Sequence, residues 1–394
     1  MNTFFKYCLL LISFFFISSC EKEKIEYHQT YNHNIYQGFS ADKNYFILHD
    51  NSITYYNSDS NKVFNNLYEH QNGEKLGNSI HSFRSFFYNY VEYKNAGVFS
   101  LEDENKLVYI DLNNFVYDLE VEIESPRNIE LVTGESYVMA WENVLPTYPH
   151  LHGSSDYQSI LVSTGKGRSG KLIALIPYNN IISDEIDTGN EPGRIYVHDF
   201  VYVFSNENSN QHDSTIAKIH YDKDRATDFQ KVEDIYIGIN PVDFDEFKET
   251  QTGFYNQSLA ILCKGDENTP PSIVLFDLVL NQIRGIHSFK DSELKPERIV
   301  NFNNPDVWFY ANNRIYSANL NQLNQAEVLI DKNISELYDC ISYNEQKEFF
   351  IGVSNNSESS KSYLYRIETY YPFEVFDSIK INEHAHKIVT SSIY

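Results

Sequence analysis

The fold is encoded most clearly in the segment Lys106-Leu-Val-Tyr-Ile-Asp-Leu-Asn-Asn-Phe-Val-Tyr-Asp-Leu-Glu-Val-Glu122. Apolar and aromatic residues fill Leu107 to Ile110, Asp111 to Asn114 interrupt them, and Phe115 to Val121 continue the pattern. β-Branched and aromatic residues fit a pleated sheet, and Asp and Asn side chains hydrogen-bond to their own backbone in turns. The segment therefore predicts two antiparallel strands joined by a polar turn.

The same unit recurs along the chain. Each copy is an apolar strand that ends in Asp, Asn or Glu; with the segment above there are seven, and the other six begin at Ile53, Ile173, Ile216, Ile273, Ile315 and Tyr363. In four copies another apolar strand precedes the unit across a polar loop, namely Ile160–Ser163, Val201–Phe204, Leu259–Leu262 and Phe349–Val353. Such regular recurrence is the sequence signature of a repeat architecture.

A strand, a polar loop, a strand, an Asx turn and a strand make up three-quarters of a four-stranded antiparallel blade. Seven copies give about 50 residues each, as in propeller blades. We therefore predict an all-β β-propeller of seven blades, or of six or eight if one repeat is misassigned. The alternating segment Phe373 to Tyr394 is expected to supply the strand that closes the ring, and Pro241 to Phe247 is assigned a helical turn.

The N-terminus has the pattern of a secretory signal peptide. Lys6 precedes an apolar run from Tyr7 to Ile17, which is too short to span a bilayer at about 20 residues. Ile17-Ser18-Ser19-Cys20 resembles a bacterial lipobox, which implies that Cys20 becomes the lipidated first residue of the mature protein. The alternative is an ordinary signal peptide with an incidental cysteine. The expected organisation is a signal peptide over residues 1–19, a lipidated tether over 20–34 and a propeller over 35–394.

The residues after Cys20 bear on location. Glu21-Lys-Glu-Lys24 partly resembles the surface-export signals of Bacteroidota lipoproteins, although a solvated linker explains it equally well. Lipobox and blade-like repeats together resemble the TolB-like propeller lipoproteins of that phylum. The resemblance implies a lipid-anchored protein of the outer membrane or cell surface, with the side of the membrane left open. It carries over no functional residue except Cys20.

Composition limits the possible partners and cross-links. The net charge of −24 argues against nucleic acid, which requires a basic face, and the 42% hydrophobic content suffices for a sizeable core. Of the four cysteines, Cys8 is lost with the signal peptide and Cys20 is assigned to the lipid. Cys263 and Cys340 lie about two repeats apart, which disfavours a disulfide. We predict that both are buried thiols.

A glycine-rich loop, Gly165-Lys-Gly-Arg-Ser-Gly170-Lys171, matches the spacing of a phosphate-binding P-loop. Leu172, however, replaces the hydroxyl residue that holds magnesium, and the following residues have the pattern of a strand where a helix is needed. We therefore expect no nucleotide. The remaining hypothesis is a basic cluster of Lys166, Arg168 and Lys171 that contacts an anionic ligand or partner, with a solvated hairpin as the alternative.

His150-Leu-His152 with Asp156 is a weak candidate for a metal site. Side chains two residues apart in extended backbone point the same way, so both imidazoles could meet one ion. His384-Ala-His386 with Glu383 repeats the pattern. Because no further ligand follows from the spacing, we expect surface or hydrogen-bonded histidines and no metal.

The sequence leaves three classes of function open. We favour a ligand-binding or protein-assembly module of the cell envelope, with the membrane, an envelope protein or a glycan as partner. No Ser/His/Asp or Cys/His pattern is visible, so we expect no catalytic residue and no cofactor. A glycan-active enzyme with an axial active site is the first alternative; it would place Asp, Glu, His or Arg with shifted pKa values around the axis. A structural spacer is the second.

Overall fold

The computed structural model describes the chain in segments that all belong to the unit Gly38–Tyr394. The described residues are 44–57, 62–88, 94–112, 114–134, 157–166, 169–176, 181–189, 191–205, 214–222, 227–249, 256–300, 306–320, 326–330, 337–342, 348–354, 362–368, 375–381 and 384–390. The segments predicted to be the signal peptide and the tether, together with Cys20, therefore lie outside the described residues. Within them, no helix is both long and apolar enough to cross a membrane.

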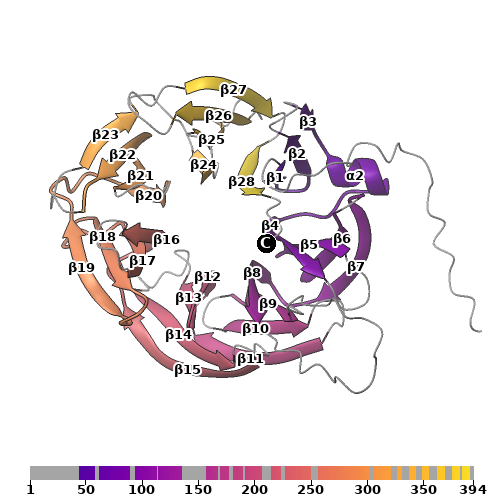
Figure 1. Ribbon diagram of the computed structural model, residues 1–394, viewed down its shortest axis with the longest axis horizontal. Helices are drawn as coiled ribbons and strands as arrows, with labels where there is room; N and C mark the ends of the chain where they lie inside the picture. The colour runs from indigo at the N-terminus through magenta and orange to yellow at the C-terminus, as the bar shows by residue number, and fades with distance from the viewer. Residues whose placement is uncertain are drawn as a thin grey trace, which may run out of the picture. The chain divides into compact units, whose positions relative to one another are not determined.

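The described strands form seven four-stranded antiparallel sheets arranged in a ring (Figure 1). From the innermost to the outermost strand, the sheets are β28 (Ala385–Thr390), β1 (Asn44–His49), β2 (Ile53–Asn57), β3 (Lys62–Phe64); β4 (Ile80–Tyr88), β5 (Lys94–Leu101), β6 (Lys106–Asp111), β7 (Val116–Glu122); β8 (Pro126–Gly134), β9 (Tyr157–Thr164), β10 (Gly170–Ile176), β11 (Ile181–Gly189); β12 (Pro192–Val197), β13 (Val201–Ser205), β14 (Thr215–Asp222), β15 (Thr227–Tyr236); β16 (Pro241–Glu249), β17 (Asn256–Cys263), β18 (Ser272–Asp277), β19 (Gln282–Ser288); β20 (Pro296–Ile299), β21 (Val307–Ala311), β22 (Arg314–Ala318), β23 (Ala326–Ile330); and β24 (Leu337–Ser342), β25 (Glu348–Ser354), β26 (Ser362–Glu368), β27 (Val375–Ile381). The predicted all-β propeller with four-stranded antiparallel blades is confirmed.

The repeats found in the sequence correspond to one layer of this ring. All seven copies are the third strand of their sheet, from β2 through β26, and the four preceding apolar segments are second strands. The hairpin predicted for Lys106 to Glu122 is β6 and β7, but Phe115 lies in its turn and not in a strand. Phe115 adopts φ 61°, and its buried ring lies 5.4 Å from that of Phe46 in the neighbouring sheet. Burial of the ring thus offsets an unfavourable backbone conformation.

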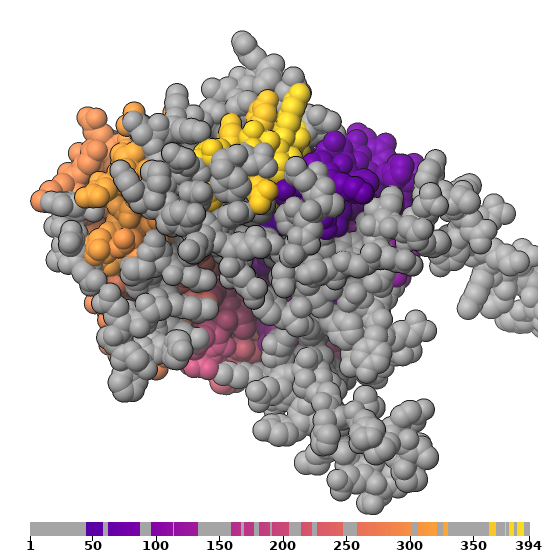
Figure 2. Space-filling view, turned by 45° about the horizontal axis from the view of Figure 1, so that its top comes forward, coloured from indigo at the N-terminus to yellow at the C-terminus, as the bar shows by residue number. Residues whose placement is uncertain are grey.

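The C-terminal strand closes the ring as expected. Residues Tyr45 to Leu48 of β1 pair antiparallel with Lys387 to Thr390 of β28, which is the innermost strand of the sheet that contains β1–β3. The yellow C-terminal strands accordingly lie beside the indigo N-terminal ones (Figure 2). Because the two ends of the described chain share one sheet, loss of either end would open the ring.

The core lies between neighbouring sheets. Rings of Phe46 from β1, Phe83 from β4 and Phe99 from β5 pack together, with centroids 5.2 Å apart for Phe46 and Phe83 and 4.4 Å for Phe83 and Phe99. A second cluster joins β4–β7 to β8–β11 through aliphatic residues such as Val98 and Val162. Each sheet therefore needs its neighbours to bury its faces, as the repeat pattern predicts.

Two local predictions have different outcomes. The helical turn assigned to Pro241–Phe247 is wrong, because these residues belong to strand β16. In that strand Phe244 is buried between the polar residues Asp243 and Asp245. The segment is too short for this alternation of buried and polar residues to distinguish a strand from a helical turn. Cys263 is a buried free thiol, as predicted; burial raises its pKa to about 12. The side chain of Cys340 lies outside the described residues.

Candidate functional site

The start of each innermost strand is irregular in the same way. In all seven described sheets, the pairing between the innermost and second strands shifts by at least one residue at this point. Such β-bulges leave residues out of the ladder and re-aim their side chains. The residues left out include His81, Arg127, Arg194 and His386, so the bulges place titratable side chains at one edge of the ring.

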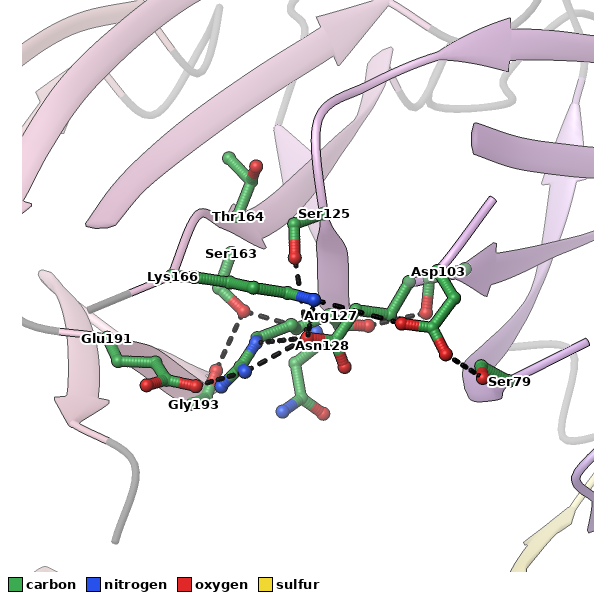
Figure 3. A network of polar contacts seen from close by, with 12 residues as sticks. Ser79, Asp103, Ser125, Arg127, Asn128, Ser163, Thr164, Lys166, Glu191 and Gly193 are labelled. Atoms are coloured by element: carbon green, nitrogen blue, oxygen red, sulfur yellow. Dashed lines mark hydrogen bonds and ion pairs between the residues drawn. The ribbon is translucent and has the colours of Figure 1, made fainter. Parts of the chain in front are cut away.

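Arg127 is the centre of a polar network at this edge (Figure 3). Its side chain is only 7% exposed, and its Nε and Nη2 donate to Glu102 Oε1 at 3.1 and 2.9 Å. Nη2 also pairs with Glu191, which immediately precedes β12. Lys166 Nζ approaches Glu102 and Asp103 at 3.8 and 3.7 Å. These five residues, which we call the Arg127 network, come from three consecutive sheets and hold them together.

The topology explains why these residues meet. Ile80 pairs with Leu101 and Pro126 pairs with Thr164, so the turn after each second strand lies beside the start of the innermost strand. The turn after β5 supplies Glu102 and Asp103, and the turn after β9 supplies Lys166. Buried Ser163 on β9 also links the sheet β8–β11 to the sheet β12–β15. Its Oγ accepts from the Asn128 amide at 3.1 Å and donates to the Gly193 carbonyl at 2.8 Å.

Two histidines occupy the bulges next to this network. His81 is the second residue of β4, and His386 is the second residue of β28. The pKa of His81 is lowered to about 3, mainly by burial and in smaller part by the Lys387 and Arg127 charges. Burial likewise lowers the pKa of His386 to about 4, with partial compensation from the Asp50 carboxylate, which lies 3.8 Å from His386 Nδ1. Both imidazoles are therefore neutral at pH 7 and offer hydrogen-bonding nitrogens rather than positive charge.

Other charges on the innermost strands are paired from sheet to sheet. Arg84 on β4 contacts Glu130 on β8 at 2.6 Å. Arg194 on β12 pairs with Asp243 on β16, whose Oδ2 accepts from the Ile299 amide of β20 at 2.9 Å. We call the surface formed by the innermost strands of the ring the inner wall. Arginines on this wall are thus paired with carboxylates of neighbouring sheets.

One carboxylate on this wall is perturbed. Burial raises the pKa of Asp245 on β16 to about 6, and Arg194 offsets part of this effect. Asp245 belongs to a different sheet from His81 and His386. The charges that act on Asp245 come from Arg194, Asp243 and Glu246, so its pKa is perturbed by a different set of neighbours from those of the two histidines.

The residues predicted from the sequence have separate positions. Lys166 joins the Arg127 network, whereas Lys171 on β10 pairs with exposed Glu185 on β11 at 3.0 Å. Each lysine therefore already has a carboxylate partner. Arg168, His150, His152 and Asp156 lie outside the described residues, so the basic cluster and the metal candidates stay predictions. The described residues contain no group of three or more metal-ligating side chains.

The sequence contains a further signal, outside the repeat pattern, for the start of the inner strands. Four of them begin with proline, at Pro126, Pro192, Pro241 and Pro296. Proline is tolerated at the first position of a strand because no ladder hydrogen bond is lost there. An arginine follows the proline within two residues in three cases, at Arg127, Arg194 and Arg298. This recurring Pro-Arg pattern marks the start of the inner strands.

Comparisons with known proteins bear on the fold. No protein-family description matches the chain, and no curated protein matches it by sequence. Among solved structures, it is similar to a functionally unknown protein from Desulfotomaculum acetoxidans (TM-score 0.57, 10% identity, 88% of this chain and 98% of that one). It is also similar to dihydro-heme d1 dehydrogenase NirN (0.52, 10%, 89% and 76%) and to Kuenenia stuttgartiensis hydrazine synthase (0.50, 8%, 79% and 90%). At such low identity these similarities establish the β-propeller class alone.

Proposed function

We propose that the seven sheets are the blades of one closed propeller that serves as a ligand-binding or protein-assembly module of the cell envelope, anchored through lipid on Cys20. The lipobox-like Ile17-Ser18-Ser19-Cys20 supports the anchor, and its combination with blade repeats resembles TolB-like propeller lipoproteins. Two or three acyl chains would hold the protein firmly on a membrane. The expected location is the outer membrane or the cell surface.

The observation that best supports the binding function is that the arginines of the inner wall are paired with carboxylates. Arg84, Arg127 and Arg194 are each engaged by a carboxylate of another strand or loop. A general acid or base needs a group free to exchange a proton with substrate, whereas these pairs fix the wall as a rigid, evenly polar frame. Such a frame suits recognition of a partner at the edge that bears the Arg127 network.

The fold by itself does not choose among functions. The structurally similar proteins include a dehydrogenase and a synthase by name, and neither activity transfers to this chain at 8–10% identity. The glycan-active alternative requires perturbed groups that converge on a substrate, whereas the charges that act on Asp245 are those of Arg194, Asp243 and Glu246, and His81 is affected by His386. The binding module is therefore the better-supported function.

Cys20→Ala tests the anchor. In cells labelled with palmitate, the full-length protein should carry label and sediment with membranes. The variant should lose the label and appear in the soluble fraction, because alanine has no thiol to carry the diacylglycerol. Cys8→Ala, which changes a cysteine within the signal peptide, is the matched control and should keep both properties. Label that persists in Cys20→Ala would overturn the anchor assignment.

A further inference from the structure

The exposed large apolar side chains of the described residues gather at one end of the sheets. Nine such residues are between 40% and 63% exposed, and five of them lie where the third strand of a sheet ends and the fourth begins. Tyr236 lies at the other end of its sheet, and the remaining three lie within outer strands. This asymmetry distinguishes the two faces of the ring. The five residues are Tyr117, Ile181, Ile182, Val279 and Leu280.

We call the face that carries these five residues the entry face, because the described chain begins there. Asn44, the first residue of β1, pairs with Asn57, the last residue of the third strand β2. Neighbouring sheets are oriented alike, since Tyr202 at the start of the second strand β13 donates to Asn281 in the turn after the third strand β18. The Arg127 network lies at the opposite face, beside the turns that follow second strands.

The connection to the proposed lipid anchor also reaches the entry face. Residues 20–43 precede Asn44 and lie outside the described residues. With lipid on Cys20, as proposed above, they join the membrane to this face. A chain of about 24 residues reaches at most roughly 85 Å when fully extended, so Asn44 stays within that distance of the bilayer. A second, weak contact with the same bilayer then becomes intramolecular, which strengthens it.

The turn between β18 and β19 exposes two apolar side chains on a fixed backbone. Val279 and Leu280 are the most exposed of the five residues, at 60% and 63%. Their amides both donate to Oδ1 of buried Asp277, at 2.9 and 2.8 Å. An amide without a partner is strongly unfavourable in an apolar medium. Because both amides are satisfied within the turn, the turn can enter the edge of a bilayer without leaving them unpaired.

The other exposed apolar residues of the entry face belong to further sheets. Ile181 and Ile182 begin β11, directly after the turn that follows β10. Tyr117 is the second residue of β7, and tyrosine is enriched at membrane–water interfaces. A protein partner favours one contiguous apolar patch, whereas a bilayer is a plane that meets separate points on one face at the same time. The arrangement therefore fits a lipid surface better than a protein partner.

Charge determines which lipid surface fits. The chain carries a net charge of −24, and Asp199 on the loop between β12 and β13 adds an exposed carboxylate to the entry face. Anionic lipid repels such a surface, because contact with it relies on lysine and arginine. Apolar contact must therefore supply the binding, and zwitterionic lipid is the expected surface.

We propose that the entry face rests on the bilayer, with Val279 and Leu280 inserted at the interface and Ile181, Ile182 and Tyr117 beside them. The Arg127 network then faces the aqueous space, where a partner can reach it. This orientation rests on the proposed lipid anchor for its natural setting, but the contact itself is made by the folded sheets and is tested separately from the anchor.

Two tryptophan variants test the contact. Leu280→Trp and Glu267→Trp place the probe at opposite ends of one sheet, because Glu267 is exposed in the turn between β17 and β18. The lipidated protein is purified from membranes and reconstituted into phosphatidylcholine vesicles that contain doxyl-labelled phosphatidylcholine as a quencher. The emission added at position 280, relative to the wild type, should fall by about half or more, since an inserted apolar side chain lies roughly 5–10 Å inside the boundary. The emission added at position 267 should not change.

A second preparation separates this proposal from the anchor. A hexahistidine tag replaces residues 1–19, Cys20 is changed to alanine, and nickel-chelating lipid holds the protein on the same vesicles. Quenching at position 280 is expected here as well, and phosphatidylglycerol in place of about a third of the lipid should reduce it. Absence of quenching at position 280 on vesicles that hold the protein, or equal quenching at positions 280 and 267, would overturn the membrane contact whatever the palmitate experiment shows.

Discussion

Replacing Arg127 with methionine should lower the free energy of unfolding by about 3 kcal/mol, the low end for breaking a buried ion pair. Methionine retains much of the apolar contact of the side chain but leaves Glu102 and Glu191 without their common partner. Both carboxylates are largely buried, with side chains 16% and 11% exposed. Lys166 compensates only in part, since it lies 3.8 Å from Glu102. Urea-induced unfolding of the full-length protein measures the loss.

Two further variants make this prediction specific. Lys171→Met removes one member of the exposed pair with Glu185 and should leave stability unchanged, because surface ion pairs contribute little. The triple variant Arg127→Met, Glu102→Gln, Glu191→Gln should recover much of the loss, since no buried charge is left unpaired. If Arg127→Met were as stable as the wild type, the network would not be what joins the three sheets.

Acidification from pH 6.5 to 4.5 should destabilise the protein through His81 and His386. Their folded pKa values are about 3 and about 4, below the 6.5 of a free imidazole, so in this window the unfolded chain binds more protons. Stability therefore falls as the pH falls, by up to about 1.4 kcal/mol per pH unit for each histidine. Partial exposure reduces this to roughly 1 kcal/mol per unit.

Asp245 acts in the opposite direction. Its folded pKa of about 6 exceeds the 3.8 of a free carboxyl, so the folded protein binds more protons between these values and gains stability on acidification. Because two histidines lower the stability on acidification and one carboxyl raises it, we expect a net loss of stability as the pH falls. Thermal unfolding at pH 6.5, 5.5 and 4.5 measures it.

The double variant His81→Gln, His386→Gln should lose this acid-induced destabilisation, because glutamine does not titrate, and should keep only the opposite slope due to Asp245. His70→Gln, on the exposed surface of helix α2 (Leu67–Asn72), is the control and should leave the slope unchanged. Lys387, Arg127, His49 and Asp50 are the charged or titratable neighbours of the two histidines and stay in place in both variants. A wild-type slope in the double variant would show that the acid sensitivity arises elsewhere.

The sequence predicts some layers of this fold better than others. Third strands such as β6 and β18 are visible because several consecutive buried residues end in an Asx turn, and Asp277 Oδ1 does accept from the amides of Val279 and Leu280. The innermost strands are less visible because bulges and polar residues interrupt their alternation. In strand β16 two aspartates flank buried Phe244, and for that reason the sequence pattern there indicates a helical turn although the segment is a strand.

The site was harder to predict than the fold. Glu102, Arg127 and Glu191 are far apart in the sequence, and only the ring brings them together. Lys166 was singled out for its glycine-rich neighbours, yet its position follows from the turn beside the start of β8. A loop motif can therefore identify a residue at a site without identifying the partners that define its role.

Site-specific photocrosslinking in cells tests the binding function most directly. A benzophenone amino acid replaces Asp103 or Lys166, whose side chains are 62% and 60% exposed beside the Arg127 network, or Ile181 or Val232 on the outer strands, which are 53% and 50% exposed. The binding module predicts a discrete adduct from the first two positions and none from the outer strands. Adducts confined to Ile181 and Val232, or cleavage of envelope glycans that the His81→Gln, His386→Gln protein no longer performs, would contradict it.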